Sequence, residues 1–386
     1  MTRNESGHGQ VTTISVRSRQ GDYPVLVGRG LLGRLPALLG AHAPAFRYAV
    51  ISDERVAGIF GQGVLDACRE GGLDAELFTF PDGEANKTRA QWSVLTDALL
   101  EWGLGRDGAI VALGGGVTGD LAGFVAATYL RGVPLVQVPT SLVAMIDASV
   151  GGKTGVDVPA GKNLVGSFHP PRVVVADPET GATLDRAERA QGYAEAVKHG
   201  SILDPEYLRF LRENAEDLLA GDAAPTLVAV EQSVQIKADV VSRDEEEGGL
   251  RQILNFGHTV GHALEAASGY GLGHGTAIAA GMILEARLGE ELGVTERGTA
   301  AGVGQALGRF GLDRPLRGLL ENPSRVLSYL DLDKKARRGR ARFVLLERIG
   351  SVHDRGGWTH DVPIEVVRRL LAEFAERHDA EGEGES

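Results

Sequence analysis

The chain has 386 residues, of which 43% are hydrophobic and 24% are charged, as in an ordinary globular protein of about two to three domains. Its 52 acidic and 40 basic residues give a net charge of −12, which argues against broad binding to nucleic acid or anionic membranes. Cys68 is the only cysteine, so an intrachain disulfide and a cysteine-based zinc site are excluded. No apolar signal segment and no run of about 18 apolar residues occurs, so we expect a cytoplasmic protein without a membrane span.

Residues 1–177 alternate short β-branched runs with helical patterns. Strands are expected at Thr12–Val16, Pro24–Val27, Arg47–Ile51, Glu76–Phe80, Ala109–Leu113, Leu135–Val138 and Val173–Ala176. Helical spacing of apolar residues marks Val56–Arg69 and Thr88–Trp102. This alternation predicts a Rossmann-like α/β domain with a mostly parallel sheet, which binds ligands at the carboxyl ends of its strands.

Residues 178–386 carry few strand signals and predict a largely α-helical domain. Long amphipathic stretches cover Arg186–Gly200, Ala224–Ser242, Leu250–Ala267 and Thr276–Leu292. Arg342–Leu346 is the only convincing late strand, and the acidic residues from about 379 to 386 are expected to form a disordered, solvated tail. The expected site is the cleft between the two domains.

A glycine-rich segment, Gly114–Asp120, follows the expected strand Ala109–Leu113 and precedes a helical pattern at Leu121–Tyr129. In that context glycines let backbone amides approach a pyrophosphate at a helix N-terminus. The acidic residue expected about twenty positions later is absent, because that position falls in an apolar strand, so the unit is not a standard Rossmann unit. Asp53 is the alternative ribose contact, although an aspartate at this place is equally typical of a helix cap.

Two further loops combine glycine with lysine. Pro81–Thr88 follows a strand and opens a helix, which is typical of a plain capped loop and also suits a nucleotide contact. Asp147–Gly155 and Gly161–Leu164 predict a long loop or small hairpin. Lys153 and Lys162 are either solvated surface lysines or part of a phosphate or carboxylate site, and the paired glycines favour the anion site.

Three of the ten histidines fall within seventeen residues, at His258, His262 and His274. On a helix, His258 and His262 project from one face, as two metal ligands do or as two polar residues at a helix edge do. The glycines around His274 allow the chain to turn back toward the pair, which favours a site without deciding which residues are ligands.

The same region holds other polar residues at helical spacing. Glu195 and Lys198 lie three apart, which by itself favours a surface ion pair. Arg251 and Asn255 precede the histidines at spacings that place them on nearly one helical stripe with His258. We expect such a stripe to face a site rather than a core.

Taken together, these segments closely resemble the 3-dehydroquinate synthase family of sugar-phosphate cyclases. The similarity is densest from about Asp82 to Arg287. The matching segments are GGGVTGDLAGFVAATYLRG, VPTSLVAMIDASVGGKTGVD, GKNLVGSFHPP, YAEAVKHG, LNFGHTVGHALE and GHGTAIAAGM. Ser141, Phe256 and His199 depart from the residues common in the family; the first two changes are conservative, and we expect His199 to pack.

The resemblance implies NAD and one divalent metal, zinc or cobalt, as cofactors. The implied metal ligands are Glu195, His258 and His274, so that His262 serves the substrate phosphate instead. The residues implied to hold NAD are Asp53, Asp82, Gly83, Glu84, Lys87, Gly115, Gly116, Val117, Gly119, Asp120, Thr140, Ser141, Lys153, Lys162, Thr180 and Thr183. The residues implied to surround the substrate are Asp147, Lys198 and Lys237 near the ring hydroxyls, and Arg131, Lys153, Asn163, Arg251, Asn255, His262 and Lys334 or Lys335 at phosphate and carboxylate.

For this family the resemblance implies conversion of 3-deoxy-D-arabino-heptulosonate 7-phosphate to 3-dehydroquinate and phosphate in the shikimate pathway. NAD oxidises the C5 alcohol transiently, which acidifies the neighbouring C6 proton so that phosphate leaves. Reduction of the ketone, ring opening and an aldol step then complete the carbocycle. A homodimer is implied as well, with Arg131 reaching a neighbouring subunit.

Three other functions fit parts of the sequence. A cyclase that makes a cyclitol precursor usually departs at Arg251 and Asn255, and both are present. A metal-dependent polyol-phosphate dehydrogenase typically has an aspartate as its first metal ligand and releases NADH. A noncatalytic NAD-binding regulator is expected to have a broken set of metal ligands or lysines, and neither set is broken here.

Overall fold

A computed structural model describes residues 11–313, 323–336 and 341–382. The chain divides into two compact units: Met1–Asp185 with Ala223–Glu246, and Arg186–Asp222 with Glu247–Ser386. Helix α9 (Ala223–Arg243) therefore belongs to the first unit by its contacts, although it lies within the segment 178–386 that was expected to form the C-terminal domain.

The first unit is built on a seven-stranded sheet with the order β1-β2-β9-β6-β5-β3-β4. β1 and β2 pair antiparallel, and every other pair in the sheet is parallel. The mostly parallel α/β sheet predicted from the sequence is thus confirmed. The strand bounds are Thr12–Val16 (β1), Tyr23–Val27 (β2), Tyr48–Asp53 (β3), Ala75–Phe80 (β4), Ala109–Gly114 (β5), Leu135–Pro139 (β6) and Val173–Ala176 (β9).

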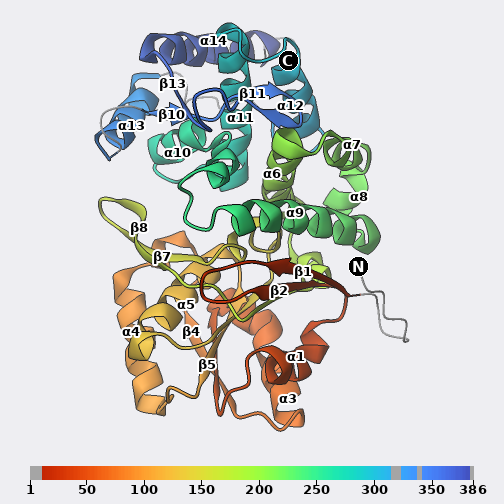
Figure 1. The fold of residues 1–386 in the computed structure, drawn as a ribbon, viewed down its shortest axis with the longest axis vertical. Coiled ribbons are helices and arrows are strands. Elements are labelled where there is room, and N and C mark those ends of the chain that lie inside the picture. The colour runs from red at the N-terminus through yellow and green to blue at the C-terminus, as the bar shows by residue number, and fades with distance from the viewer. Residues whose placement is uncertain (1–10, 314–322, 337–340, 383–386) are drawn as a thin grey trace. The chain divides into compact units, whose positions relative to one another are not determined.

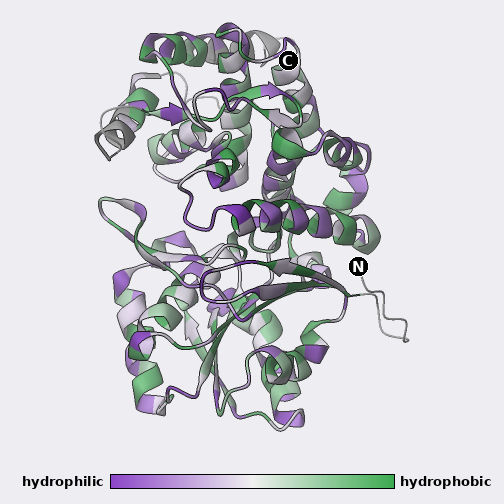
Figure 2. Cartoon of the chain, in the orientation of Figure 1, coloured by the Kyte–Doolittle hydropathy of each residue, from purple (hydrophilic) through white to green (hydrophobic). Residues whose placement is uncertain are grey.

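Helices cover both faces of this sheet, which explains why its central strands β3 and β5 are buried along their whole length. α1 (Leu35–His42) and α3 (Gln62–Glu70) pack on one face, and α4 (Arg89–Trp102) and α5 (Gly116–Thr128) on the other (Figure 1). Hydrophobic residues accordingly concentrate along the strands (Figure 2). The helix expected at Val56–Arg69 is present but interrupted, with α2 (Glu54–Val56) and a π turn (Ala57–Gly61) ahead of α3.

A β-hairpin extends from the first unit where a long loop or small hairpin was expected. β7 (Lys153–Val158) and β8 (Gly161–Phe168) pair antiparallel. Shorter turns complete the unit, at Leu32–Arg34 (η1), Glu84–Asn86 (η3), Tyr129–Arg131 (η4), Ala144–Ala148 (η5) and Pro178–Thr183 (η6).

The second unit is largely α-helical, as predicted. Its helices are α6 (Arg186–Leu203), α7 (Pro205–Glu213), α8 (Ala215–Ala220), α10 (His258–Ala267), α11 (His274–Glu291), α12 (Thr299–Gly308), α13 (Pro323–Ala336) and α14 (Ile364–Gly382). None of the helices in the described part of the chain is long and apolar enough to cross a membrane.

The structure corrects the helix expected at Leu250–Ala267. A 3₁₀ helix, η7 (Leu250–Asn255), ends before α10 begins at His258. Between them Gly257 has φ +81°, a conformation that breaks an α-helix and favours glycine. Arg251 and Asn255 therefore do not share one helical stripe with His258.

Two expectations near the C-terminus also change. The strand expected at Arg342–Leu346 is divided between β10 (Arg342–Phe343), which pairs with β13 (His360–Asp361), and β11 (Leu346–Arg348), which pairs with β12 (Ser351–Val352). α14 continues to Gly382, so the first residues of the expected tail are helical, and 383–386 lie outside the described residues.

Candidate active site

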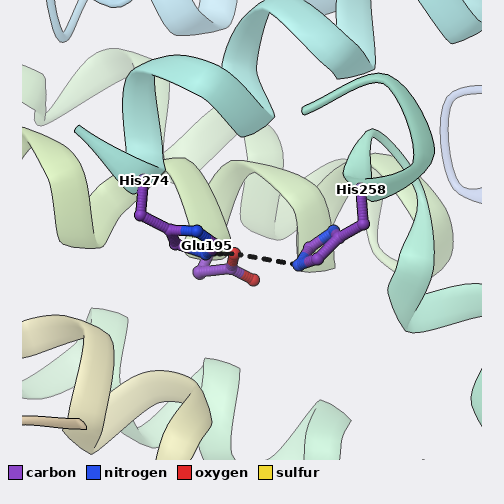
Figure 3. A group of neighbouring side chains, drawn as sticks. All are labelled: Glu195, His258 and His274. Atoms are coloured by element: carbon purple, nitrogen blue, oxygen red, sulfur yellow. Dashed lines mark hydrogen bonds and ion pairs between the residues drawn. The ribbon is translucent and has the colours of Figure 1, made fainter. Parts of the chain in front are cut away.

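Three side chains of the second unit converge on one point. Glu195 lies in the middle of α6, His258 begins α10 and His274 begins α11. Nε2 of His258 lies 3.6 Å, and Nε2 of His274 lies 3.3 Å, from Oε1 of Glu195 (Figure 3). Their ligand atoms all lie within 4.8 Å of one another. One carboxylate and two imidazoles suit zinc or cobalt and leave coordination positions for a substrate.

The charges around this point keep Glu195 ionised and His258 neutral, which are the forms that bind a metal. Burial alone raises the pKa of Glu195, but Lys198, His258 and His274 together hold that pKa well below its usual range. Burial, reinforced by Lys198, lowers the pKa of His258, so its imidazole is in the neutral form that binds metal. Burial also lowers the pKa of His274, but the carboxylates of Glu195 and Glu265 raise it to about 10. A metal ion that bound at Nε2 of His274 would have to displace this proton.

Lys198 and Glu195 form an ion pair, but not the surface pair that their spacing favoured. Their side chains are 1% and 0% exposed. A carboxylate at this depth requires neighbouring positive charge, because the desolvation cost of an isolated buried ion is several kcal/mol. Lys198 supplies that charge from the next turn of α6 and lies beside the candidate metal ligands.

Glu285 of α11 supports the start of α10. Its fully buried carboxylate accepts hydrogen bonds from the backbone N–H of Gly257 (2.8 Å) and Val260 (3.3 Å). These are among the backbone donors that a helix N-terminus leaves without intrahelical partners. Glu285 thus fixes the turn from which His258 projects. Burial raises the pKa of Glu285 to about 8, although the backbone N–H donors lower it.

We expect Glu285→Gln to change how the free energy of unfolding depends on pH. Glu285 retains its proton in the folded state up to about pH 8. The unfolded chain loses that proton near pH 4.3, so the folded state binds more protons between these values. The free energy of unfolding therefore falls as pH rises through this window, by up to about 1.4 kcal/mol per pH unit from this group.

Urea unfolding from pH 5 to 8 should show a shallower decline of the free energy of unfolding in the variant. Glu291→Gln on the exposed side of α11 is the control, and parallel curves for Glu285→Gln and wild type would contradict the prediction.

Of the other residues predicted for the substrate, His262 lies next to the candidate metal ligands. The ring of His262 lies 5.2 Å from that of His258 and 6.3 Å from that of His274. Arg251 is buried in η7, and Asn255 donates a hydrogen bond to Oε1 of Glu247 at 2.6 Å. The side chains of Lys334 and Lys335 lie outside the described residues.

In the first unit, the glycine-rich turn connects β5 to the N-terminus of α5. Gly115 is the N-cap, and a Cβ there would lie 3.4 Å from Oγ of Ser141, which places Ser141 beside the turn. The N–H of Thr140 donates to the carbonyl of Gly114 at 2.9 Å. Asp53 accepts from the N–H of Val56 at 2.9 Å, so it is a helix cap, one of the two roles considered for it. It also accepts a hydrogen bond from Thr118 at 3.0 Å, which brings it next to the turn.

Several charged residues predicted to contact NAD form one cluster around the buried side chain of Lys87. Nζ of Lys87 lies 2.9 Å from Glu84 and 3.3 Å from Asp120, and Nζ of Lys162 lies 3.5 Å from Glu84. Burial raises the pKa of Asp120 to about 6, although Lys87 lowers it. Asp157, which sequence reasoning missed, joins this cluster 3.7 Å from Lys87.

Other residues predicted to bind NAD lie in two turns and at the start of α5. Gly83 has φ +98° and its carbonyl accepts from the N–H of Asn86, which shapes the loop that begins at Asp82. In η6 the hydroxyl of Thr183 donates to the carbonyl of Thr180 at 2.8 Å. The predicted residues Gly116, Val117 and Gly119 lie in the first turn of α5.

The hairpin and α9 place three predicted substrate residues. Nζ of Lys237 donates to the carboxylate of Asp147 at 2.6 Å, so these two residues are adjacent. Lys153 begins β7, and Asn163 lies in β8 with φ +56°. The carboxylate of Asp157 accepts from the N–H of Asn163 at 2.8 Å and stabilises this conformation.

Arg131 ends the turn η4, which follows α5. It has φ +71° and lines a cavity of about 580 Å³ in the first unit. Among the described residues that line this cavity are Tyr23, His42, Phe168, His169 and Arg172, and none of the other predicted site residues.

Sequence reasoning missed four residues that hold the predicted site in place. They are Asp157, Glu247, Glu265 and Glu285. Glu265 offered a signal, because it lies seven residues after His258 and so on the same face of α10. Glu285 offered none, since its partners are backbone groups of another helix.

Two solved structures with the same fold are cyclases that have NAD+ and a divalent metal bound. 2-deoxy-scyllo-inosose synthase complexed with carbaglucose-6-phosphate, NAD+ and Co2+ has a TM-score of 0.86 and 27% identity, with 94% of this chain and 100% of that chain covered. 2-epi-5-epi-valiolone synthase from Streptomyces hygroscopicus subsp. jinggangensis, with NAD+ and Zn2+ bound, has a TM-score of 0.84 and 27% identity, with 94% and 99% covered. The fold and the group of candidate metal ligands together place the chain among the sugar-phosphate cyclases.

Sequence comparison identifies the family within that class. Residues 77–191 match the 3-dehydroquinate synthase N-terminal family, and residues 192–336 match the 3-dehydroquinate synthase C-terminal family. The chain is 46% identical to a 3-dehydroquinate synthase of Symbiobacterium thermophilum over 332 residues, which cover 86% of this chain and 92% of that protein. A 3-dehydroquinate synthase of Nitrosomonas europaea is 42% identical over 330 residues, covering 85% and 88%. The chain belongs to the 3-dehydroquinate synthase family.

Proposed function

We propose that this chain converts 3-deoxy-D-arabino-heptulosonate 7-phosphate to 3-dehydroquinate and phosphate. The observation that carries the proposal is the convergence of Nε2 of His258 and Nε2 of His274 on the buried carboxylate of Glu195, in a chain of this family. The family relatives and the cyclases with bound NAD and metal support the activity and both cofactors.

The proposed roles divide between the two units. Glu195, His258 and His274 hold the divalent metal, and the glycine turn of α5 with the Lys87 cluster holds NAD. When bound, NAD accepts and returns one hydride and the metal acidifies the substrate hydroxyls.

The chain's own side chains orient the substrate and exclude water. Asp147, Lys198 and Lys237 are proposed to contact the ring hydroxyls, since their charged groups are largely buried and can exchange hydrogen bonds with them. The proposed contacts to phosphate and carboxylate are Arg131, Lys153, Asn163, Arg251, Asn255, His262 and Lys334 or Lys335. Basic and amide groups suit these anions, which explains such residues in a chain of net charge −12.

Release of phosphate without net formation of NADH tests the activity. We expect the protein loaded with NAD and zinc or cobalt to release phosphate from 3-deoxy-D-arabino-heptulosonate 7-phosphate while absorbance at the NADH band returns to its starting value. Protein stripped of metal by a chelator is the control and should release none. Net NADH formation with a simple polyol, or no phosphate release by the loaded protein, would contradict the proposal.

We also propose a cytoplasmic homodimer. Support comes from Arg131, which lines a cavity separate from the other predicted residues and whose family role is to reach a neighbouring subunit. The mass of the purified protein in solution, measured by light scattering, tests the dimer.

A further inference from the structure

We propose that Glu265 is the positioning residue that fixes His274 as a metal ligand through Nε2; this inference rests on the proposed metal site. Glu265 lies near the C-terminal end of α10 and its side chain is 5% exposed. Oε1 of Glu265 lies 3.4 Å from Nδ1 of His274, whereas Nε2 of the same ring lies 3.3 Å from Oε1 of Glu195. The two ring nitrogens thus face two different carboxylates.

A histidine that binds metal uses one nitrogen without a proton, while the other nitrogen carries the proton and donates it in a hydrogen bond. In His274 the carboxylate of Glu265 is the acceptor for Nδ1–H, which leaves the lone pair on Nε2 for the metal. His258 follows the same pattern with a weaker acceptor. Its Nδ1 lies 3.2 Å from the carbonyl oxygen of Phe256, and its Nε2 faces Glu195.

The backbone of Glu265 also holds the turn that presents His274. Its carbonyl accepts hydrogen bonds from the hydroxyl of Ser268 at 2.7 Å and from the N–H of Tyr270 at 2.9 Å. Ser268 in turn accepts from the N–H of Leu272 at 3.0 Å, immediately before α11 begins at His274. The side chain of Glu265 thus contacts the ring of His274, and its backbone carbonyl contacts the turn that leads to that residue.

A competing arrangement must be distinguished, because Glu265 also belongs to a second group that could hold a metal, with His262 and His274. In that group Glu265 is itself a ligand, and the metal lies on the Nδ1 side of His274. Burial favours the first arrangement. Glu195 is fully buried and paired with Lys198, whereas His262 is exposed.

The test measures the affinity for Co2+ and the visible absorption of the Co2+ complex in the full chain with NAD bound. For Glu265→Ala we expect affinity to fall about 10-fold to 100-fold and the cobalt spectrum to change. For Glu265→Gln, whose amide oxygen still accepts Nδ1–H, we expect a smaller loss and a spectrum close to wild type. His262→Ala is the matched control on the same helix and should retain the wild-type affinity and spectrum. NAD affinity and the circular dichroism of each metal-free variant should remain unchanged, which separates positioning from unfolding.

Each other outcome overturns the inference. Wild-type affinity and spectrum in Glu265→Ala would show that His274 needs no such partner. Equal loss of metal in Glu265→Ala and His262→Ala would make Glu265 a ligand of the second group. If His258→Ala bound cobalt as tightly as wild type, the proposed metal site itself would be wrong. This result would distinguish failure of the metal site from failure of the positioning role of Glu265.

Discussion

His258→Ala is expected to lose the bound divalent metal and to lower turnover by at least about a thousandfold, which corresponds to about 4 kcal/mol of transition-state stabilisation. Nε2 of His258 is one of three ligand atoms within 4.8 Å of one another, and α10 begins at this residue. Without it, Glu195 and His274 offer only two protein ligands. Metal content by elemental analysis and phosphate release at saturating NAD are the measurements.

The contrast with His262→Ala makes this prediction specific. His262 lies on the next turn of α10, so its replacement removes an imidazole of the same kind from the same helix. We expect His262→Ala to impair turnover while metal content remains close to wild type, because its proposed partner is the substrate phosphate. If His262→Ala lost the metal and His258→Ala retained it, the assignment of ligands would be wrong.

Most of the fold could be predicted because its signals are local. Most strands of the sheet are short runs of mainly apolar or β-branched residues, and glycine marks the start of α5. A parallel strand that is buried on both faces is a nearly continuous hydrophobic run, so it can be recognised from its own residues alone. The second unit was recognised as helical for the same reason.

The candidate metal site could be predicted only in part from the sequence. Spacing suggested His258 and His262 as a pair, whereas the structure brings His258 and His274 to Glu195 from three different helices. Glu195 itself matched a surface ion pair with Lys198, because its burial depends on how α6 packs. Resemblance to the family, and not helical spacing, indicated this set of ligands.

Features that depend on backbone conformation were also missed. The periodicity from Leu250 to Ala267 fits one helix, but Gly257 has φ +81° and α10 starts anew at His258. The cause lies in a neighbouring helix, since the N–H of Gly257 donates to Glu285 of α11. A pattern read along one segment contains no information about such a partner.

Contact between the backbones of α10 and α11 leads to the largest expected effect on stability. A Cβ on Gly281 of α11 would lie 1.9 Å from the carbonyl oxygen of Gly257 and 2.9 Å from the nitrogen of Gly261. Both obstacles are backbone atoms at the start of α10, so no side-chain rotation relieves the overlap. We expect Gly281→Ala to lower the free energy of unfolding by about 3 kcal/mol.

The matched control, Gly304→Ala, adds the same methyl group within α12, where a Cβ would lie 3.9 Å from a side-chain atom of Ile283. It should raise stability by about 0.5 to 1 kcal/mol, because alanine loses less conformational entropy than glycine in a helix. Urea unfolding of the metal-free proteins compares the two.

Because the displaced segment carries His258, Gly281→Ala should also bind Co2+ more weakly under conditions where it remains folded. If Gly281→Ala and Gly304→Ala both unfolded at the wild-type urea midpoint, α10 could move away from α11 at little cost in free energy. The contact at Gly281 would then not fix the position of His258.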